Sequence, residues 1–222
     1  MRKIVIRRYG LPVPKIVDHV KRRQHIARAH QREVAEHGFS ATTYARVAAA
    51  ADLSVGTIQH YFVDRAELVR FSFDDLLTTR DDRVTVVVEA GEDSRRPIRA
   101  IVVEALHELL PLDETRRREH SVGQQLRAEA WREPALRDLA VQADARLHER
   151  LRVAVENGTV CGEVEPDTDP HLSATRILAT AQGLADQLAL SSDPASSADD
   201  VLGPVVRTVF TGRCHRYPES DE

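Results

Sequence analysis

The sequence is poor in aromatic residues and lacks long apolar runs. Aromatic residues make up 5% of its 222 positions, and tryptophan occurs once. Alanine is abundant instead, which favours packed helices over a β-sandwich and predicts an all-α fold. No run approaches the roughly 18 apolar residues of a membrane-spanning helix, and no charged-then-apolar leader opens the chain. We therefore expect a cytoplasmic protein with no membrane partner.

Cysteine occurs only twice, as Cys161 and Cys214. Two cysteines are too few for a disulfide framework or a zinc cluster, so we expect two reduced thiols. A redox sensor is the alternative, and it requires an exposed thiol with a lowered pKa. The sequence also lacks a Gly-rich phosphate loop, a Ser/His/Asp elbow motif and metal-ligand spacing. We expect no enzyme, no cofactor and no metal site; an all-α hydrolase or isomerase is the alternative.

Acidic residues are scarce near the N-terminus. Residues 1–70 contain 13 Lys+Arg and 6 Asp+Glu, a net charge of +7, whereas the remainder contains 18 and 29, a net charge of -11. A basic head on an acidic body is expected of a nucleic-acid module joined to a second domain. We assign residues 1–20 to a basic arm that follows phosphates or enters a minor groove; a disordered extension is the alternative. The head itself is assigned to 21–66.

One stretch near the N-terminus predicts the starts of three successive helices. It covers residues 42–68, TTYARVAAAADLSVGTIQHYFVDRAEL. Thr43, Ser54 and Asp64 are good N-cap residues, and Glu67 follows Asp64 at the spacing of a capping box. A helix, a tight turn and a second short helix form the sequence pattern of a helix-turn-helix. The outer face of the second helix contains no acid, and its side chains are small or end in hydrogen-bonding groups. A helix that enters the major groove needs both properties.

The same stretch resembles the DNA-binding segment of the TetR (tetracycline-repressor) family of bacterial regulators. The similarity has no gap and rests on Gly38-Phe39, Thr42-Thr43, Val47-Ala48, Ala51, Leu53-Ser54, Gly56-Thr57, His60-Tyr61-Phe62 and Glu67-Leu68. A second stretch, PLDETRRRE at 111–119, is similar to one in the subgroup with a betaine-repressor-like C-terminal domain. The resemblance implies a three-helix head and a larger helical domain for ligand binding and dimerisation, residues 67–222.

The resemblance also implies which residues contact DNA. Val55 and Gln59 would face base edges, and Gly56 would allow the backbone to approach the groove floor. Lysine is common where Val55 stands, so we expect weaker non-specific affinity and a flatter salt dependence. The remaining DNA contacts, mostly to phosphates, would come from Thr42, Thr43, Arg46, Ser54, Thr57, His60, Tyr61 and Arg65.

Apolar periodicity predicts helices along the rest of the chain. The expected ranges are 21–37, 64–90, 98–110, 113–131, 134–157, 170–190 and 197–211, with loops at 91–96 and 158–168. Gly38 should end the first of these, and an Asn157-Gly158 stop should end the fifth. His30 is polar where the family is usually apolar, so we expect it at the rim of the head.

Two further sites are predicted in the body. Gly123 stands where the subgroup commonly has tryptophan, so the missing ring could leave room for a ligand, or Trp131 could refill the volume. The ligand-binding candidates are His107, Gln124, Arg127 and Trp131. By family resemblance the last two helices would pair with those of a second subunit, and the alternative is an internal core. The candidate dimer residues are Ile177, Leu184, Leu188, Val201, Val205, Val209 and Phe210.

Together these features predict a ligand-responsive transcriptional regulator. By family habit it would be a repressor, released from its operator when a small molecule binds the body. A single helix-turn-helix buries little surface, so we expect a homodimer on a palindromic operator in double-stranded DNA. The alternatives are a helical ligand-binding or scaffold protein without DNA binding and, less favoured, the all-α enzyme.

Overall fold

The computed structural model describes residues 15–191 and 195–215, with side chains from residue 19 and again from residue 198 onward. These residues form nine α-helices and no β-strand, as the sequence predicts. No described helix is long and apolar enough to cross a bilayer. The helices are α1 (Lys15–His37), α2 (Tyr44–Ala50), α3 (Val55–Tyr61), α4 (Arg65–Asp93), α5 (Ile98–His107), α6 (Glu114–Glu129), α7 (Pro134–Cys161), α8 (Pro170–Ala189) and α9 (Ala195–Arg207).

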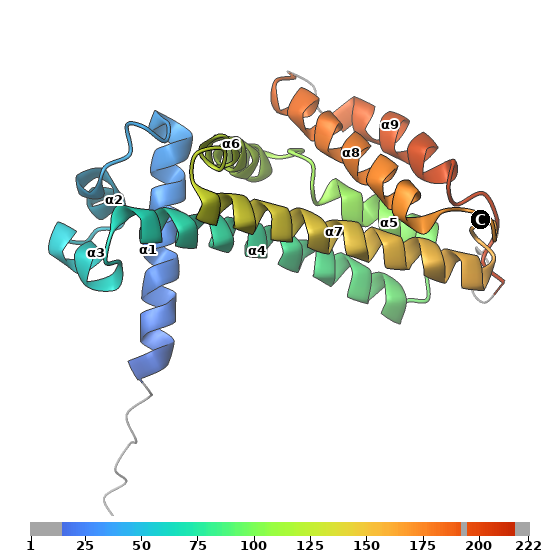
Figure 1. Cartoon of the computed structure of the whole chain (residues 1–222), viewed down its shortest axis with the longest axis horizontal. Coiled ribbons are helices and arrows are strands. Elements are labelled where there is room, and N and C mark those ends of the chain that lie inside the picture. The colour runs from blue at the N-terminus through green and yellow to red at the C-terminus, as the bar shows by residue number, and fades with distance from the viewer. Residues whose placement is uncertain (1–14, 192–194, 216–222) are drawn as a thin grey trace, which may run out of the picture.

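The molecule has a small head and an elongated body (Figure 1). Helices α1 to α3 form the head at one end. Helix α4 starts in the head and continues far into the body; its 29 residues span about 43 Å at 1.5 Å per residue. Helix α7 lies along α4, and α8 and α9 lie side by side at the end away from α3. Helix α4 is thus a continuous covalent link between the two regions.

The predicted helix caps of the head are confirmed. Thr43 Oγ1 accepts a hydrogen bond from the Arg46 amide at 3.3 Å, and Ser54 Oγ accepts from the Thr57 amide at 3.1 Å. Asp64 caps α4 by accepting from the backbone N–H three residues on, at 2.7 Å. Each bond satisfies an amide that has no partner within its own helix. These three caps fix where α2, α3 and α4 begin.

The core of the head is a compact apolar cluster. Its buried members come from α1, α2, α3 and the residues around the start of α4: Ile26, Ala29, Val47, Ala48, Ala51, Ile58, Phe62 and Leu68. The Arg23 guanidinium lies 4.3 Å from the ring centroid of Phe62 and 4.6 Å from that of Phe71. Arg23 also forms a 2.8 Å ion pair with Glu67. This contact joins α1 to α4 and covers one edge of the aromatic core.

A second cluster joins the head to the body. It is built from α1, α4, α6 and α7 and contains Val34, Phe73, Leu76, Leu77, Val122, Leu126, Leu136 and Ala143. Gln125 of α6 adds polar contacts at the same place. Its Oε1 accepts from the Phe39 amide at 2.9 Å, and its Nε2 donates to the Val34 carbonyl at 3.3 Å. Because α1 ends here, Gln125 supplies a partner to the turn that leads into α2.

The body has its own core between α5, α7, α8 and α9, and two glycines allow its helices to approach closely. A Cβ on Gly91 would lie 2.6 Å from Ile101, and one on Gly158 would lie 2.6 Å from Val164. Both glycines are helical, whereas we expected Gly91 in a loop and Gly158 at a helix end. Helix α7 instead ends at Cys161 and is capped by Gly162, which has a φ of +90°. Glycine is therefore needed at position 158 for close packing and not to end the helix.

Two other boundaries differ from the sequence-based expectation. Helix α1 begins at Lys15, so residues 15–20 belong to a helix and not to an extended arm. Residues 1–14, which would form the rest of the predicted arm, lie outside the described residues. Helix α5 ends at His107, three residues before its predicted end. The β-branched run at 84–88 is helical within α4, as we expected.

Candidate DNA-binding surface and ligand cavities

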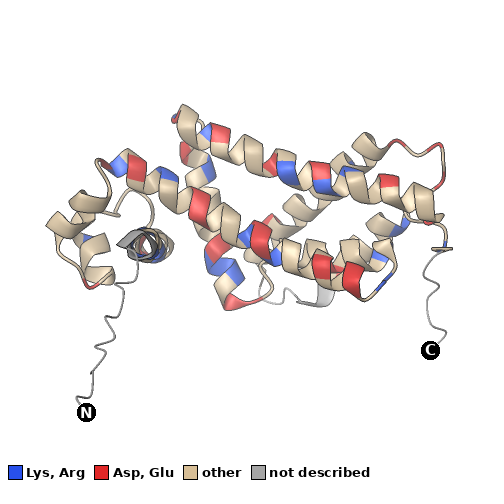
Figure 2. Ribbon diagram, turned by 90° about the horizontal axis from the view of Figure 1, so that it is seen from below, with Lys and Arg blue, Asp and Glu red and all other residues tan. Residues whose placement is uncertain are grey.

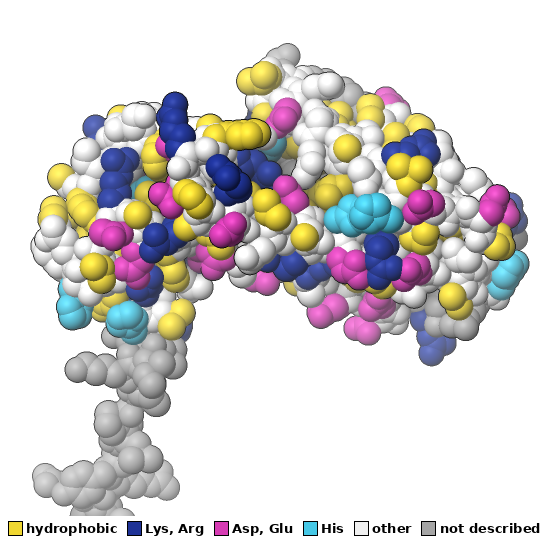
Figure 3. Space-filling model, in the orientation of Figure 1, with side chains coloured by type: hydrophobic (Ala, Val, Ile, Leu, Met, Phe, Trp, Pro, Cys, Tyr) yellow, Lys and Arg dark blue, Asp and Glu magenta, His cyan; other side chains and the backbone are white. Residues whose placement is uncertain are grey.

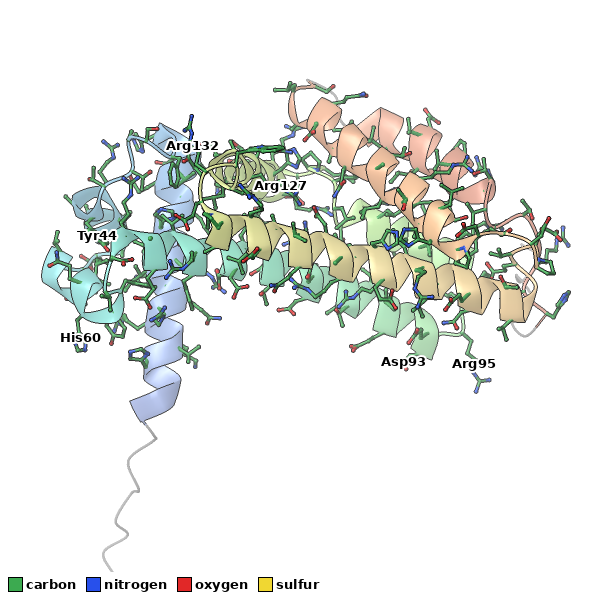
Figure 4. The ribbon with its side chains drawn as sticks, viewed as in Figure 1. Tyr44, His60, Asp93, Arg95, Arg127 and Arg132 are labelled. Atoms are coloured by element: carbon green, nitrogen blue, oxygen red, sulfur yellow. The ribbon has the colours of Figure 1, made fainter. Side chains whose placement is uncertain are left out.

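Helix α3 presents an exposed face without acidic side chains. Val55 is 37% exposed, and Gly56, Gln59 and His60 are exposed as well. The ribbon of α3 has no acidic residue along its length (Figure 2). His60 extends from α3 at the edge of the head, away from the body (Figure 4). This convex face is free to approach a partner with hydrogen-bonding edges and negative charge.

The polar residues around α3 are held by local contacts. The Ser54 and Thr57 hydroxyls lie 2.9 Å apart, so one donates to the other. The Tyr61 ring contacts two histidine rings, with centroids 4.8 Å from His19 and 5.3 Å from His60. Thr43 is exposed at the start of α2. These contacts orient the side chains before any ligand is present.

Arg46 and Arg65 are the exposed cations closest in sequence to α3. Arg46 forms a 2.9 Å ion pair with Glu33, and the arginine side chain is 42% exposed. The Glu33 side chain is 12% exposed and also lies 3.3 Å from His37 Nδ1, so it keeps a neighbour if a phosphate draws Arg46 away. Arg65 donates to the Phe39 carbonyl at 3.1 Å and lies 5.3 Å from the centroid of that ring. Its remaining N–H groups can reach an anion.

Thr42 does not lie on this surface. It is 2% exposed, and its hydroxyl donates to the Gly38 carbonyl at 3.0 Å. The side chain therefore closes the turn between α1 and α2. The prediction that Thr42 contacts DNA is wrong, because the adjacent threonine, not Thr42, faces solvent.

His30 is inside the core of the head, so its predicted position at the rim is also wrong. It is 1% exposed, and neither ring nitrogen has a hydrogen-bond partner among the described residues. Burial, with a smaller contribution from the positive charge of Arg65, lowers the pKa of His30 to about 4. The ring is therefore neutral at pH 7 and packs as an apolar side chain of the right size.

The body contains a partly open cavity of about 770 Å³ between α4, α5 and α7. Its volume is within the range of small-molecule sites. Charged groups, including Glu89, Arg96 and Arg150, lie around it. Arg95 also lines it, and this residue and Asp93, the last residue of α4, lie at the end of the body away from the head (Figure 4). The apolar lining includes Val84, Val88, Ile98, Ile101, Val102, Ala105, Leu109, Leu147 and Leu151.

A smaller and more polar cavity of about 270 Å³ lies between α4, α6, α7 and α8. Gly123, Gln124 and Arg127 line it, and a Cβ on Gly123 would still be 3.7 Å from Leu76. There is thus space beside Gly123. The Gln124 amide donates to Asp186, and Arg127 pairs with the Asp144 carboxylate. Binding of a ligand by Gln124 and Arg127 stays a prediction.

His107 and Trp131 line neither of these cavities. His107 Nε2 lies 2.9 Å from an Asp199 carboxylate oxygen, between α5 and α9. Trp131 is 83% exposed in the turn between α6 and α7. A ligand-binding role for these two residues stays a prediction, but Trp131 is too exposed to refill the space beside Gly123. Its indole points to solvent because the turn carries it away from the α6 core face.

Most of the predicted dimer residues are buried inside a single chain. Ile177, Leu184, Leu188, Val209 and Phe210 are at most 6% exposed and pack against α5 and α7 in the core of the body. They cannot form an exposed seam, so this prediction is wrong for them. Val205 is half-buried, and Val201 is 36% exposed. Apolar side chains on the visible face of α8 and α9 lie between polar ones (Figure 3).

Cys161 and Cys214 meet at the end of α7, and both are 6% exposed. Burial is the main cause that raises the pKa of the Cys161 thiol to about 11. The group is a neutral thiol at pH 7, unlike the exposed, acidic thiol of a redox sensor. Glu163, which sequence reasoning missed, lies beside them and accepts from the Ile98 and Arg99 amides at 2.8 Å. No local motif marks it, because its partners are distant in sequence.

Comparison with protein families matches both regions of the chain. Residues 27–70 match the model for bacterial regulatory proteins of the tetR family, and residues 98–204 match the C-terminal domain of BetI-type transcriptional repressors. Among curated proteins, the HTH-type transcriptional regulator PksA of Bacillus subtilis is 31% identical over 110 residues. That match covers 50% of this chain and 52% of PksA, so the chain aligns with about half of that relative.

Solved structures share the fold over most of the chain. A TetR-family regulator from Cytophaga hutchinsonii has a TM-score of 0.74 at 18% identity, covering 88% of this chain and 98% of its own. A putative regulator from Saccharomonospora viridis, solved in complex with choline, has a TM-score of 0.71 at 24% identity, with 84% and 94% covered. At these identities the likeness establishes the fold.

Proposed function

Because the chain belongs to the TetR family of bacterial regulatory proteins, we propose that it is a ligand-responsive transcriptional regulator that places α3 in the major groove of DNA. The acid-free, exposed face of α3 is the observation that carries this proposal. We assign DNA binding to the head, through about residue 66, and ligand binding and dimerisation to the body. DNA binding implies a cytoplasmic location.

Within α3, Gln59 and Val55 are assigned to base edges. A glutamine amide can pair with both N6 and N7 of adenine, and a valine methyl can contact the methyl group of thymine. Gly56 adds no side chain that would hold the backbone away from the groove. The phosphate contacts are assigned to Thr43, Arg46, Ser54, Thr57, His60, Tyr61 and Arg65. Phosphate contacts set affinity and register, whereas base contacts set sequence preference.

The second half-site requires a second copy of the chain, and we place the dimer contact on the outer face of α8 and α9. Ala179 and Gly183 of α8 are exposed, and so are Val201 and Pro204 of α9. A Cβ added to Gly183 meets no atom of the described chain within 4 Å. Small side chains let another helix approach closely, and a two-fold axis through this face would match a palindromic operator.

The effector is assigned to the cavity of about 770 Å³. Its apolar walls and charged surroundings suit a small apolar or amphipathic molecule, and the Saccharomonospora viridis protein was solved in complex with choline. Helix α4 lines the cavity and begins beside α3. A ligand that favours one placement of α4 would change the spacing of two heads, and several kcal/mol of differential affinity would release the repressor.

Fluorescence anisotropy of the full chain against a library of randomised duplexes tests the proposal. We expect selection of a two-fold symmetric site bound by two copies. Loss of affinity with rising salt should report the phosphate contacts. The control is a Gly56→Glu variant, which puts an acid on the exposed face of a helix that otherwise has none. Equal binding by the control and the unaltered chain would contradict the proposed DNA-binding surface.

A further inference from the structure

Two thiols and a carboxylate from distant parts of the chain converge at the far end of the body. Cys161 ends α7, Glu163 follows in the next turn, and Cys214 lies in the segment after α9. Their ligand atoms all lie within 4.8 Å of one another, and all three residues are buried. Two backbone hydrogen bonds fix the arrangement: His215 N–H to the Cys161 carbonyl at 2.8 Å, and Gly212 N–H to the Glu163 carbonyl at 3.0 Å.

The spacing within this cluster matches metal coordination. Zinc lies about 2.3 Å from a thiolate sulfur and about 2.0–2.2 Å from a carboxylate oxygen, with tetrahedral geometry. Those values place a sulfur and an oxygen of one coordination shell about 3.6 Å apart. The distance from Cys161 Sγ to Glu163 Oε1 is 3.5 Å. The Cys161 thiol donates to Glu163 across this distance, and an ion that replaces its proton could bind both atoms, with the Cys214 ligand atom within 4.8 Å of each.

We propose that Cys161, Glu163 and Cys214 bind a thiophilic divalent cation of the zinc type. Thiolate and carboxylate are both established zinc ligands, and three protein ligands leave one coordination position open. Both cysteines also line the cavity of about 770 Å³. The open position therefore lies at the cavity wall, where water or a donor atom of a cavity ligand completes the shell.

The proton balance of binding is explicit. The cation replaces the two thiol protons, which leave to solvent, and two thiolates with one carboxylate then surround a charge of +2. Glu163 is already oriented, because its oxygens accept from the Ile98 and Arg99 amides at the start of α5. Each carboxylate oxygen has a second lone pair, so these hydrogen bonds leave capacity for the metal and act as its outer shell.

Binding would join three elements that are otherwise held by weaker contacts. The ion connects the end of α7, the start of α5 through Glu163, and the segment after α9. That segment follows the helix pair on which we place the dimer contact. Metal binding itself does not depend on DNA binding, so the two proposals can fail separately.

Cobalt titration of the full, reduced and metal-free chain tests the site. A Co²⁺ ion bound by thiolate shows sulfur-to-metal charge-transfer absorption, and these are the only two cysteines in the sequence. We expect one Co²⁺ per chain with that absorption, displaced by Zn²⁺. Calorimetry in buffers of different ionisation enthalpy should show two protons released per ion. Cys161→Ser and Cys214→Ser should each weaken Zn²⁺ binding more than about 100-fold, beyond the loss of an outer-shell partner.

The matched control is the cluster of Glu33, Glu36 and His37 in α1, whose ligand atoms also lie within 4.8 Å of one another, with Glu36 and His37 exposed. His37→Ala should leave the stoichiometry and the absorption unchanged. Circular dichroism of each serine variant verifies its fold, and protection of the thiols from a disulfide reagent by Zn²⁺ provides a second readout on the unaltered chain. Absence of charge-transfer absorption at saturating Co²⁺, or unchanged Zn²⁺ affinity in the double serine variant, overturns the proposal.

Discussion

The head and the body form their proposed binding sites in opposite ways. The face of α3 is convex and comes from consecutive residues, 54–61, held by a local cap. The large cavity is concave, and its walls come from α4, α5 and α7. The comparison teaches that a local sequence pattern can specify a surface helix and its chemistry. A cavity depends instead on how distant helices pack.

The largest expected effect comes from separating the two heads. Gly183→Arg adds a long charged side chain to the outer face of α8, where the single chain has room for it. We expect a monomer whose specific DNA affinity falls at least about 1,000-fold, to the level of non-specific binding. Analytical ultracentrifugation and anisotropy measure both effects. The control is Val86→Arg, which adds the same side chain at an exposed position of α4. If Gly183→Arg still formed a dimer with full DNA affinity, α8 would not be part of the dimer interface.

Replacing the buried histidine should separate core stability from DNA chemistry. His30 has a pKa near 4 in the folded head against 6.5 in an unfolded chain, so the unfolded state binds more protons between these values. The neutral His30 ring therefore does not lower the free energy of unfolding above pH 6.5. As the pH drops to 4, protonation of this histidine in the unfolded state lowers that free energy by about 3 kcal/mol. His30→Leu should abolish this part of the loss and stabilise the head at pH 7 by about 1–3 kcal/mol.

Denaturant unfolding of the unaltered chain and His30→Leu at several pH values measures this difference. His60→Leu, with its exposed ring, is the matched control for removing a histidine from the head. If the stability difference between His30→Leu and the unaltered chain stayed constant from pH 7 to pH 4, the buried ring would not be the source.

Two substitutions in the head should separate sequence reading from general affinity. Gln59→Ala should change the preferred operator and cost about 1–3 kcal/mol on the preferred site only. Arg65→Ala should weaken binding to all sequences alike, because a phosphate contact carries no sequence information. Titration of each variant against a set of randomised sites measures both patterns. A uniform loss for Gln59→Ala would remove its assignment to a base edge.

The joint between head and body can be weakened at one side chain. Gln125→Leu removes the acceptor of the Phe39 amide, and leaving that group unpaired should cost about 1–3 kcal/mol if it stays buried. We expect faster amide hydrogen exchange in the turn after α1 and a weaker effect of any effector on DNA affinity. Gln142→Leu, at an exposed position of α7, is the control. Unchanged exchange at Phe39 would show that Gln125 does not hold the turn.

The smallest expected effect is an added charge on α3. Val55→Lys introduces the residue that is common at this position in the family and adds a phosphate contact on the exposed face. The slope of log affinity against log salt should become steeper by about 0.9 for each added contact. Non-specific affinity should rise while the preferred operator changes little. The measurement is anisotropy at several salt concentrations, and an unchanged slope would place residue 55 away from phosphate.

The parts of the molecule that could be predicted from sequence depend on neighbouring residues. The caps at Thr43, Ser54 and Asp64 are correct because a cap involves residues two or three positions apart. The prediction that α3 has an exposed face without acidic residues is correct for the same reason. Apolar periodicity also placed the helices of the body, with errors mainly at their ends.

The errors concern what covers each residue. The apolar stripe of α8 was correctly expected to be buried, but its cover is the chain's own α5 and α7 and not a second subunit. Gly158 was interpreted as a stop signal, whereas Val164 and Phe210 pack against its Cα. The Cys161 and Glu163 cluster has no sequence signature, since its third member is Cys214. Periodicity specifies a buried side, and only the tertiary structure identifies the neighbour.

DNA binding by an intact pair of heads is the most direct measurement of the central claim. A short duplex selected from random sequence, mixed with purified full-length chain, should form a complex with two chains per duplex by native mass spectrometry. The complex should be lost in high salt and when α3 carries an acid. A chain that is dimeric and folded but retains no duplex at low salt would contradict the account.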